Sequence, residues 1–452
     1  MNDIKFNDVS MSYKSLLDDL WRKGFTLVSA EHYKCLVEGK ELTKTELDDF
    51  YSRMNLLKEM LNDVKLRVHS LVITGSDALE RWRSFTSFTH PMRHLPRQLL
   101  LKCEKGKEPL LCTQAYCKFL QIAVSNPELL QPGSSLENDQ PNGIKTLRSF
   151  HLCEAPGAFV LALKHCLANL DIKLDWKMNS LSSQQNDSFK HAAPIEFDDN
   201  FNNNSARMVF GPDGSGDILN FTNEFLQKFV ADFGKFHIIT ADAGIDCTDE
   251  PIDQERKMLP LIEKQLEIAF ECLCTGGNFL IKIFTFFENE TIQLLTKLCG
   301  AFERVECLKP PSSKPGNSEI YLLCINFFGQ SKQKNVALSR FFTQQIEECA
   351  RFFINHQIRF IQFNLHTFRR LSQSERANLE FQKCIVQEVM ADFLWHKIFG
   401  YLFSFPPPSQ FFENYVKMVS LNNNCRTHRA VSNDTKINKI RLDLTEIQTP
   451  KN

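Results

Sequence analysis

The sequence of 452 residues lacks a long apolar run, a strong net charge and an apolar leader, and each absence removes a class of protein. A membrane-spanning helix needs about 20 apolar residues in succession, so we expect a soluble protein with no membrane partner. The net charge of −1 provides no overall field that would attract nucleic acid, so a basic surface has to be local. The polar first residues, MNDIKFNDVS, do not form a signal peptide, and we therefore expect an intracellular protein.

The 15 cysteines lack the spacing of a metal site. Cys272 and Cys274 are one residue apart, CxxC pairs are missing, and no matching histidine pair follows. Structural zinc sites are usually built from such pairs, so the sequence predicts no metal. An odd number of cysteines in a chain without a signal peptide predicts free thiols in a reducing compartment.

Residues 147–167, LRSFHLCEAPGAFVLALKHCL, combine a short apolar run, a turn of small residues and an apolar segment of helical period. A strand, a tight turn and a helix form the opening unit of an open α/β sheet. The turn at 154–158 would leave free backbone N–H groups at the carboxyl edge of the strand, where a ligand can bind. An ordinary βα turn has the same pattern, so both interpretations stay open. Since GxGxxG is absent from this turn, the sequence does not favour a dehydrogenase.

Apolar strands and helices alternate over residues 147–329. We predict strands at 172–176, 236–241, 278–284, around Val305 and at 319–327, and helices at 259–274 and 288–299. Pro260 would stand in the first turn of its helix, and Gly276 and Gly277 would end that helix. This alternation predicts the fold class α/β, with a Rossmann-like doubly wound sheet.

Apolar residues recur at helical spacing before residue 70 and again over 340–403. The sheet is therefore expected to carry helical N- and C-terminal extensions. We predict a helical N-terminal region at 1–79, the α/β domain at 80–330, a helical C-terminal extension at 331–405 and a polar, mobile tail at 406–452.

Residues 80–107 alternate cations with aromatic side chains, among them Trp82, Phe85 and Phe88. Single-stranded nucleic acid binds such surfaces because its phosphates attract cations and its bases stack on rings. The alternative is a solvated basic face whose aromatic residues turn into the core. From the first interpretation we predict RNA contacts for the cations Arg93, Arg97 and Lys102.

Asp242, Lys282 and Glu319 come at the ends of predicted strands, and Lys118 lies in an apolar helix predicted at 112–124. A structural lysine, or a lysine that snorkels to solvent, is the ordinary explanation for each cation. If the four side chains met, a second cation and partial burial would lower the pKa of one lysine and make it a general base near neutral pH. The carboxylates would orient its ammonium group. A ribose hydroxyl is a poor nucleophile, so its alkylation calls for such a base.

Two further carboxylates stand where a nucleoside-binding sheet uses them. Asp175 lies near the end of the strand predicted at 172–176, where a carboxylate can accept hydrogen bonds from ribose hydroxyls. Asp217 lies near the end of the glycine-containing turn FGPDGSGDI.

Seven motifs, in this order, resemble the FtsJ-like (RrmJ-type) family of S-adenosylmethionine-dependent RNA ribose 2'-O-methyltransferases. The motifs lie within residues 80–330 and are SFT (87–89), CTQAYCKF (112–119), HLCEAPGAF (151–159), FGPDGSGDI (210–218), TADAGIDC (240–247), FLIKIFTFFE (279–288) and SSKPGNSEIYLLC (312–324). The order of seven motifs is far more specific than any one of them.

The resemblance implies S-adenosyl-L-methionine as cofactor and a Lys-Asp-Lys-Glu tetrad of catalytic residues, at Lys118, Asp242, Lys282 and Glu319. Lys282 would be the general base, with Asp242 and Lys118 holding it and Glu319 in support. The cofactor-binding residues implied in this way are Gly157, Ala158 and Phe159 beside the methionine part, Trp176 or Asp175 beside the adenosine, and Asp217 and Asp242.

The resemblance further implies capped RNA, either mRNA or small nuclear RNA, as the partner, and a location in the nucleus or the cytoplasm. The motifs resemble most strongly those of family members that methylate the second transcribed nucleotide, which converts cap1 to cap2. Two alternatives stay open. The chain could methylate the first cap nucleotide or structured RNA, or it could bind RNA without catalysis.

Overall fold

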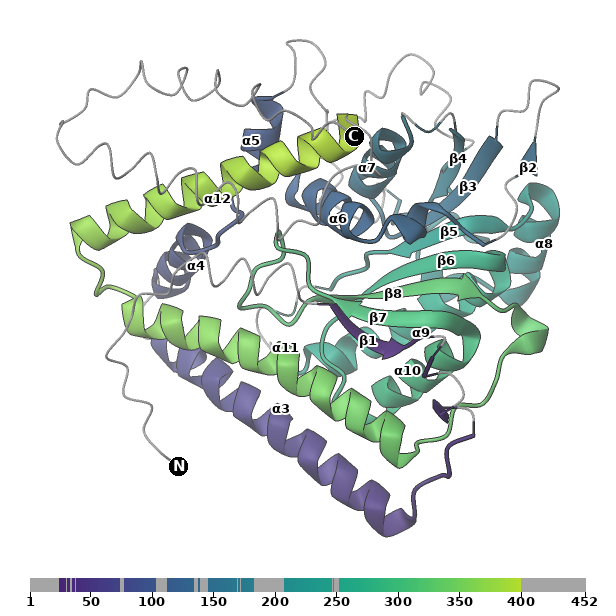
Figure 1. Cartoon of the computed structure of the whole chain (residues 1–452), viewed down its shortest axis with the longest axis horizontal. Coiled ribbons are helices and arrows are strands. Elements are labelled where there is room, and N and C mark those ends of the chain that lie inside the picture. Colours follow the sequence, from purple (N-terminus) through teal and green to yellow (C-terminus); the bar gives the residue numbers. More distant parts are fainter. Residues whose placement is uncertain are drawn as a thin grey trace, which may run out of the picture. The chain divides into compact units, whose positions relative to one another are not determined.

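A computed structural model describes residues 24–399, except for 30, 33–34, 37, 74–76, 103–111, 134–136, 139–144, 169, 171, 183–206, 246 and 248–251. Within these residues the chain forms an eight-stranded mixed sheet with helices on both faces (Figure 1). The predicted α/β fold with helical extensions is therefore confirmed. The tail predicted at 406–452 lies outside the described residues, as do residues 1–23.

The sheet has a parallel half and an antiparallel half. β3 (Lys145–Leu152), β4 (Ile172–Met178), β5 (Phe236–Ala241) and β6 (Leu273–Ile283) are parallel, in the order β4-β3-β5-β6. β8 (Ile320–Phe327) pairs antiparallel with β6, and β7 (Phe302–Leu308) pairs antiparallel with β8. The short β2 (Glu137–Asn138) pairs with the start of β3. The parallel half places the carboxyl ends of its strands at one edge, where ligands bind in such sheets.

The N-terminal region differs from its prediction. Gly24–Val28 forms a strand, β1, that pairs antiparallel with β7 and closes that side of the sheet, so the prediction of a wholly helical region is wrong there. The segment is short and its neighbours are polar, so the sequence shows no alternation that would distinguish a strand. After it comes the predicted helix, α3 (Lys44–Val72), which begins at a capping box between Thr43 and Glu46.

The helix and strand that meet near residue 273 also differ from the prediction. α9 (Gln254–Cys272) begins five residues before the predicted start, so Pro260 lies inside the helix rather than in its first turn. β6 begins directly at Leu273, and both glycines lie within it. A Cβ atom on Gly277 would lie 2.9 Å from the carbonyl oxygen of Cys274, which explains the glycine there without a helix end.

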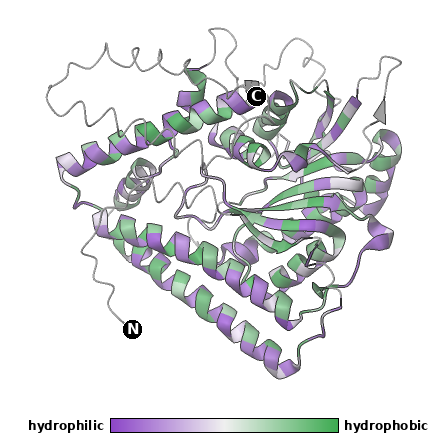
Figure 2. Ribbon diagram, in the orientation of Figure 1, coloured by the Kyte–Doolittle hydropathy of each residue, from purple (hydrophilic) through white to green (hydrophobic). Residues whose placement is uncertain are grey.

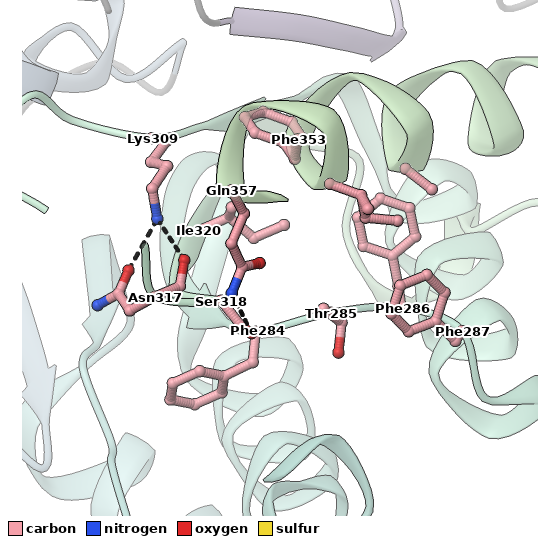
Figure 3. Close-up of a pocket in the computed structure, with 12 residues that line it drawn as sticks. Phe284, Thr285, Phe286, Phe287, Lys309, Asn317, Ser318, Ile320, Phe353 and Gln357 are labelled. Carbon is pink, nitrogen blue, oxygen red and sulfur yellow. Dashed lines mark hydrogen bonds between the residues drawn. The ribbon is translucent and has the colours of Figure 1, made fainter. Parts of the chain in front are cut away.

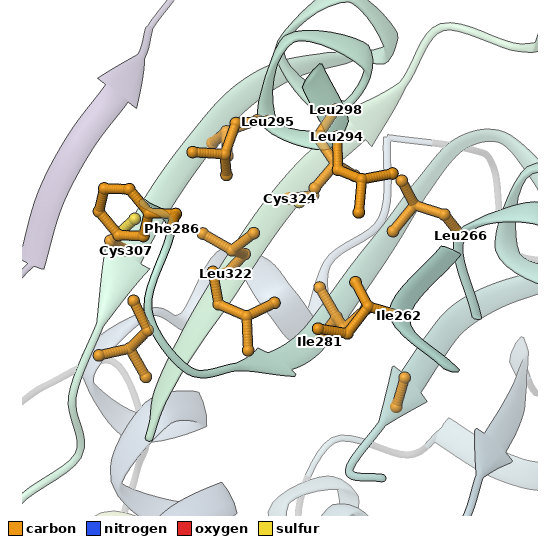
Figure 4. Packing of buried hydrophobic residues seen from close by; sticks show 14 of the residues in the cluster. Ile262, Leu266, Ile281, Phe286, Leu294, Leu295, Leu298, Cys307, Leu322 and Cys324 are labelled. Carbon is orange, nitrogen blue, oxygen red and sulfur yellow. The ribbon is translucent and has the colours of Figure 1, made fainter. Parts of the chain in front are cut away.

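Helices cover the sheet on its two faces. α6 (Gln114–Ser125) and α7 (Ala158–Leu167) pack together on one face, through Phe119 and Phe159. α8 (Asn223–Phe233), α9 and α10 (Asn289–Ala301) cover the other, where leucine and isoleucine side chains from the helices meet those of β6 and β8 (Figure 4). Short 3-10 turns connect several elements, at Pro127–Leu130, Ile218–Asn220 and Gln330–Lys332.

Two long C-terminal helices complete the described chain, as predicted for 340–403. α11 (Arg340–Thr367) runs beside α3 (Figure 1), with apolar residues of both helices in the main core and polar faces outward (Figure 2). α12 (Gln373–Phe399) packs on α5 (Leu95–Leu100) and α6. α4 (Ala78–Phe88) packs its aromatic residues on Phe368.

These C-terminal helices hold the turn that follows α4. Asn364 of α11 accepts a hydrogen bond from Thr89, and two buried residues of α12, Lys383 and Gln387, donate to the carbonyl oxygens of Phe88 and Pro91. The turn leads into α5 and the predicted RNA-binding arginines. The helical extension therefore supports the segment that carries these arginines.

Candidate active site

The structure brings the four predicted tetrad residues together in two ion pairs. The Nζ atom of Lys282 lies 3.1 Å from Oδ1 of Asp242, and it also donates to the Asp242 carbonyl oxygen at 3.0 Å. The Nζ atom of Lys118 lies 2.6 Å from Oε1 of Glu319. All four side chains are at least four-fifths buried, so these pairs are only weakly screened by solvent.

The fold explains why residues so distant in sequence meet. Asp242 directly follows β5, at the carboxyl edge of the parallel half, and Lys282 is the penultimate residue of the neighbouring β6. Lys282 is paired in register with Tyr321 of β8, so both side chains point to the same face. On this face α6 supplies Lys118, while Ile281 and Ile283 point into the opposite core.

Two further side chains bind the carboxylates of the tetrad. The Tyr321 hydroxyl donates to Oδ1 of Asp242 at 2.9 Å, and the Ser313 hydroxyl donates to Oε1 of Glu319. The sequence analysis did not assign a role to either residue, although both lie in the motif at 312–324. Their closeness to Glu319 in the sequence could have indicated such contacts, since Ser313 is six residues before it and Tyr321 is two residues after it.

The charges of the tetrad support one another. Burial alone would raise the pKa of Glu319, but the ammonium groups of Lys118 and Lys282 bring that pKa to about 2. Burial alone would lower the pKa of Lys282, but Asp242 and Glu319 raise it above its ordinary value. The expectation that a second cation and burial lower the pKa of this lysine is therefore wrong for the protein without its ligands.

A cavity of about 610 Å³ opens beside Asp242 and Lys282. Its walls come from the segments that follow β3, β4 and β5, and its lining includes Cys153, Ala155, Pro156, Ser180, Leu181, Gly216, Asp217, Ile218, Ala243, Gly244 and Ile245. This is the position in which open α/β sheets hold nucleotide ligands. Lys118 and Glu319 are not part of the lining, so the cavity meets one half of the tetrad.

The small-residue turn at 154–158 forms one wall of this cavity. Ala155 and Pro156 line it, while Gly157, Ala158 and Phe159 lie just behind them and are buried. Gly157 adopts a left-handed conformation, with φ of 104°, that allows the chain to enter α7. The buried carboxylate of Glu154 accepts a hydrogen bond from the Phe159 N–H at 2.6 Å and so satisfies one donor of the helix start.

The structure places the predicted adenosine-side residues away from the cavity. β4 continues to Met178, so Asp175 lies inside the strand, where it pairs with Arg207. Trp176 is 4% exposed and packs with Val160 and Met178. The predicted strand end is therefore wrong, because the sequence after Trp176 offers no turn signal before residue 179. Ser180 and Leu181, beyond the true end, are the residues of this segment that line the cavity.

Asp217, in contrast, lies on the cavity wall. Its carboxylate caps the 3-10 turn that follows, accepting from the Leu219 N–H at 3.0 Å. The preceding Gly216 has a φ of 76°, and a Cβ atom there would lie 2.0 Å from the Ser180 carbonyl oxygen. The glycine thus lets two cavity walls approach closely. The carboxylates of Asp217 and Asp242 and the volume of this cavity together fit a nucleoside cofactor such as S-adenosylmethionine.

Different residues of the segment at 80–107 agree with different interpretations, either an RNA-binding surface or a basic face whose rings belong to the core. Trp82 and Phe85 are buried against Phe368, so these rings belong to the core and offer no stacking surface. Arg93 and Arg97 are exposed, as predicted for RNA contacts. Lys102 forms an ion pair with Asp392 of α12, which gives it a structural partner.

Lys314 is a further cation that the sequence analysis missed. It is exposed in the loop that precedes Glu319. Partial burial, and then the nearby charges of Arg93, Arg83 and Lys118, lower its pKa. A group of cations that repel one another favours a bound anion, so this surface suits an RNA phosphate.

The described residues contain no group of three or more His, Cys, Asp or Glu side chains that could hold a metal ion. In the same part of the chain, none of the helices combines the length and the apolar character needed to cross a membrane.

A Rossmann-like sheet with a Lys-Asp-Lys-Glu tetrad beside a cavity at its carboxyl edge defines a methyltransferase-type α/β domain. Residues 113–327 match the model of the FtsJ-like methyltransferase family. The match confirms, over these residues, the resemblance seen in the sequence motifs.

Relatives with curated names extend the similarity beyond this domain. The chain is 31% identical to cap-specific mRNA (nucleoside-2'-O-)-methyltransferase 2 of Pongo abelii over 75% of this chain and 45% of that protein. The proteins of the same name from Danio rerio and Mus musculus are 32% and 29% identical, over 73% and 85% of this chain and 45% and 49% of their own length. The chain thus spans about half the length of these relatives.

Proposed function

We propose that this chain is an S-adenosylmethionine-dependent RNA ribose 2'-O-methyltransferase that methylates the second transcribed nucleotide of capped RNA. The observation that carries the proposal is the tetrad, whose Asp242 and Lys282 border a cavity large enough for the cofactor. The names of the relatives support the RNA cap as the substrate. Messenger RNA or small nuclear RNA, and a nuclear or cytoplasmic location, remain predictions.

S-adenosylmethionine would supply an electrophilic methyl group on a cationic sulfur. Asp217 and the turn backbone around Gly157 would hold it, and Asp242 would orient the Lys282 ammonium group beside it. The positive charge of the bound cofactor would lower the pKa of Lys282 and favour its free amine. With the methyl donor bound, Lys282 would act as the base that accepts the proton of the ribose 2'-hydroxyl. Alignment of donor and acceptor contributes much of the rate.

The RNA would approach from the side of α5 and Lys314. Arg93, Arg97 and Lys314 are exposed cations on segments that flank the tetrad, and they would bind phosphates. Such contacts position the strand but carry no sequence information. Choice between the first and second cap nucleotide would therefore depend on the distance between the bound 5' end and Lys282.

The test is methyl transfer from labelled S-adenosylmethionine to RNAs of one sequence that end in cap0, cap1 or an uncapped triphosphate. Nuclease mapping then locates the label. We expect label on the second nucleotide of the capped RNAs. Label on the first nucleotide, or on internal positions of uncapped RNA, would support the alternative methyltransferases. RNA binding with no transfer to any of these RNAs would support a module without catalysis.

A further inference from the structure

Lys309 is a buried lysine beneath the tetrad that the proposed chemistry does not use. It directly follows β7, and only 4% of its surface is exposed. Its ammonium group donates hydrogen bonds to the carbonyl oxygen of Asn317 at 2.9 Å and to Oδ1 of the same residue at 2.8 Å (Figure 3). It also donates to the carbonyl oxygen of Glu319 at 2.6 Å. A buried ammonium group is costly unless it is hydrogen-bonded, so these contacts hold their acceptors firmly.

These hydrogen bonds join the two ends of the loop at 310–318. The loop leaves β7 after Lys309 and returns to β8 at Glu319, so one side chain at its start binds the backbone at its end. Between these ends the loop carries Ser313, which donates to the Glu319 carboxylate, and Lys314, which is exposed toward Arg93. Lys309 thus fixes the backbone of Glu319 while Lys118 and Ser313 bind its carboxylate.

Neighbouring elements hold the rest of the loop. Gln121 of α6 accepts a hydrogen bond from the Ser312 N–H, and a ring nitrogen of the buried His90 contacts the Ser312 carbonyl oxygen. Gln357 of α11 donates to the Gly316 carbonyl oxygen. It also donates to the Ser318 hydroxyl (Figure 3). These side chains hold loop residues that precede Glu319, whereas Lys309 binds the backbone of Glu319 itself.

We propose that Lys309 is a positioning residue of the methyl-transfer reaction, which holds Glu319 at the distance and angle that its ion pair with Lys118 requires. The inference rests on the proposed function. It goes beyond the tetrad because it assigns a role to a lysine that touches neither the cavity nor the cation of Lys282. A displacement of about 1 Å at such a site can cost about 100-fold in rate.

The first test replaces Lys309 with methionine, which keeps much of the side-chain volume and removes the charge. We expect kcat to fall about 10- to 100-fold, with little change in the KM for cofactor or RNA. The pH–rate profile provides a second signature. A displaced Glu319 no longer raises the pKa of Lys282, so the rising limb of the profile moves to lower pH, as it also should in Glu319→Gln. An unshifted limb with wild-type kcat would overturn the proposal.

The matched control is Lys383→Met. Lys383 is equally buried, at 1% exposed, and also donates to a backbone carbonyl oxygen, that of Phe88, but it lies in α12 away from the tetrad. We expect this variant to lose stability without a shift of the pH–rate profile. The same shift in both variants would mean a general loss of structure and would contradict a specific role for Lys309.

A third arm uses Lys309→Ala, whose shortened side chain leaves space next to a small existing cavity of about 20 Å³. Added propylammonium should restore part of the lost rate in a saturable manner, whereas propanol of similar size should not. Rescue by both compounds, or by neither, would contradict a role for the ammonium group. If these variants fail to fold, Asn317→Ala removes one of the three acceptors and should shift the profile in the same direction by a smaller amount. An unshifted profile in that variant would also overturn the proposal.

Failure of this inference differs from failure of the proposed function. A wild-type protein that transfers no methyl group to any RNA would refute the function. An active wild type whose Lys309 variants keep their rate and pH profile would refute only the role of Lys309.

Discussion

The two halves of the tetrad differ in what surrounds them. Asp242 and Lys282 border the cavity, whereas Lys118 and Glu319 lie behind them, held by α6 and the loop at 310–318. The first half can touch a cofactor and a ribose, so we propose that it performs the chemistry. The second half would act on the first through charge and position. If one signature of four residues contains two functions in this way, substitutions should separate them.

The largest expected effect is at Lys282, the proposed base. We expect Lys282→Ala to reduce kcat at least about 1,000-fold, because general-base catalysis typically contributes 10²- to 10⁴-fold and the attacking oxygen also loses its alignment. Cofactor binding, measured by calorimetry, should stay within a few-fold of the wild type. Near-normal turnover would remove Lys282 from the base role.

The second-largest loss of rate should come from a substitution of Asp242, which is paired with Lys282. Asp242→Asn keeps the shape of the side chain but removes the charge that orients the Lys282 ammonium, and we expect a loss of about 100-fold in kcat. Its cofactor affinity should fall as well, since Asp242 lines the cavity. Single-turnover rates together with binding titrations separate the two effects. A loss of affinity with an unchanged rate would place Asp242 with the cofactor alone.

In the buried half the main effect should be on pH dependence. The charge of Glu319 raises the pKa of Lys282. Because the proposed mechanism uses the free amine of Lys282, we expect the rate to rise with pH. Glu319→Gln removes this charge and lowers that pKa, so the rising limb should move to lower pH, with a loss of about 10-fold at the plateau. Single-turnover rates across the pH range measure both. A limb that moves to higher pH would contradict the assignment.

The smallest effect on chemistry should come from cations outside both halves. Replacing Arg93 and Arg97 by alanine should weaken RNA binding about 10-fold at low salt and reduce the salt slope by about 1.4, since each single-strand phosphate contact contributes about 0.7. The rate at saturating RNA should stay unchanged. An unchanged salt slope would mean that these arginines form only a solvated face.

The sequence allowed a better prediction of one half than of the other. Strand period and turn residues predicted β5 and the end of β6, and hence that Asp242 and Lys282 come at one sheet edge. The pairing of Lys118 with Glu319 depends on a helix packing across the sheet, and spacing alone does not determine such packing. Its assignment came from the family resemblance.

Other errors have local physical causes. The strand end near Asp175 was misplaced because β4 continues through residues that carry no turn signal. The aromatic residues of 80–107 were open to two interpretations until the structure placed Phe368, which directly follows α11, as their partner. The raised pKa of Lys282 could not be predicted, because it depends on distances to two carboxylates that compete with burial.

The most direct measurement uses capped RNAs of one sequence that differ in a single oxygen. Three cap1 RNAs would carry ribose throughout, a 2'-deoxy second nucleotide or a 2'-deoxy third nucleotide, and label from S-adenosylmethionine would be counted after one turnover. We expect equal transfer to the first and third RNAs and none to the RNA that lacks the second 2'-hydroxyl. Undiminished transfer to that RNA would contradict this expectation.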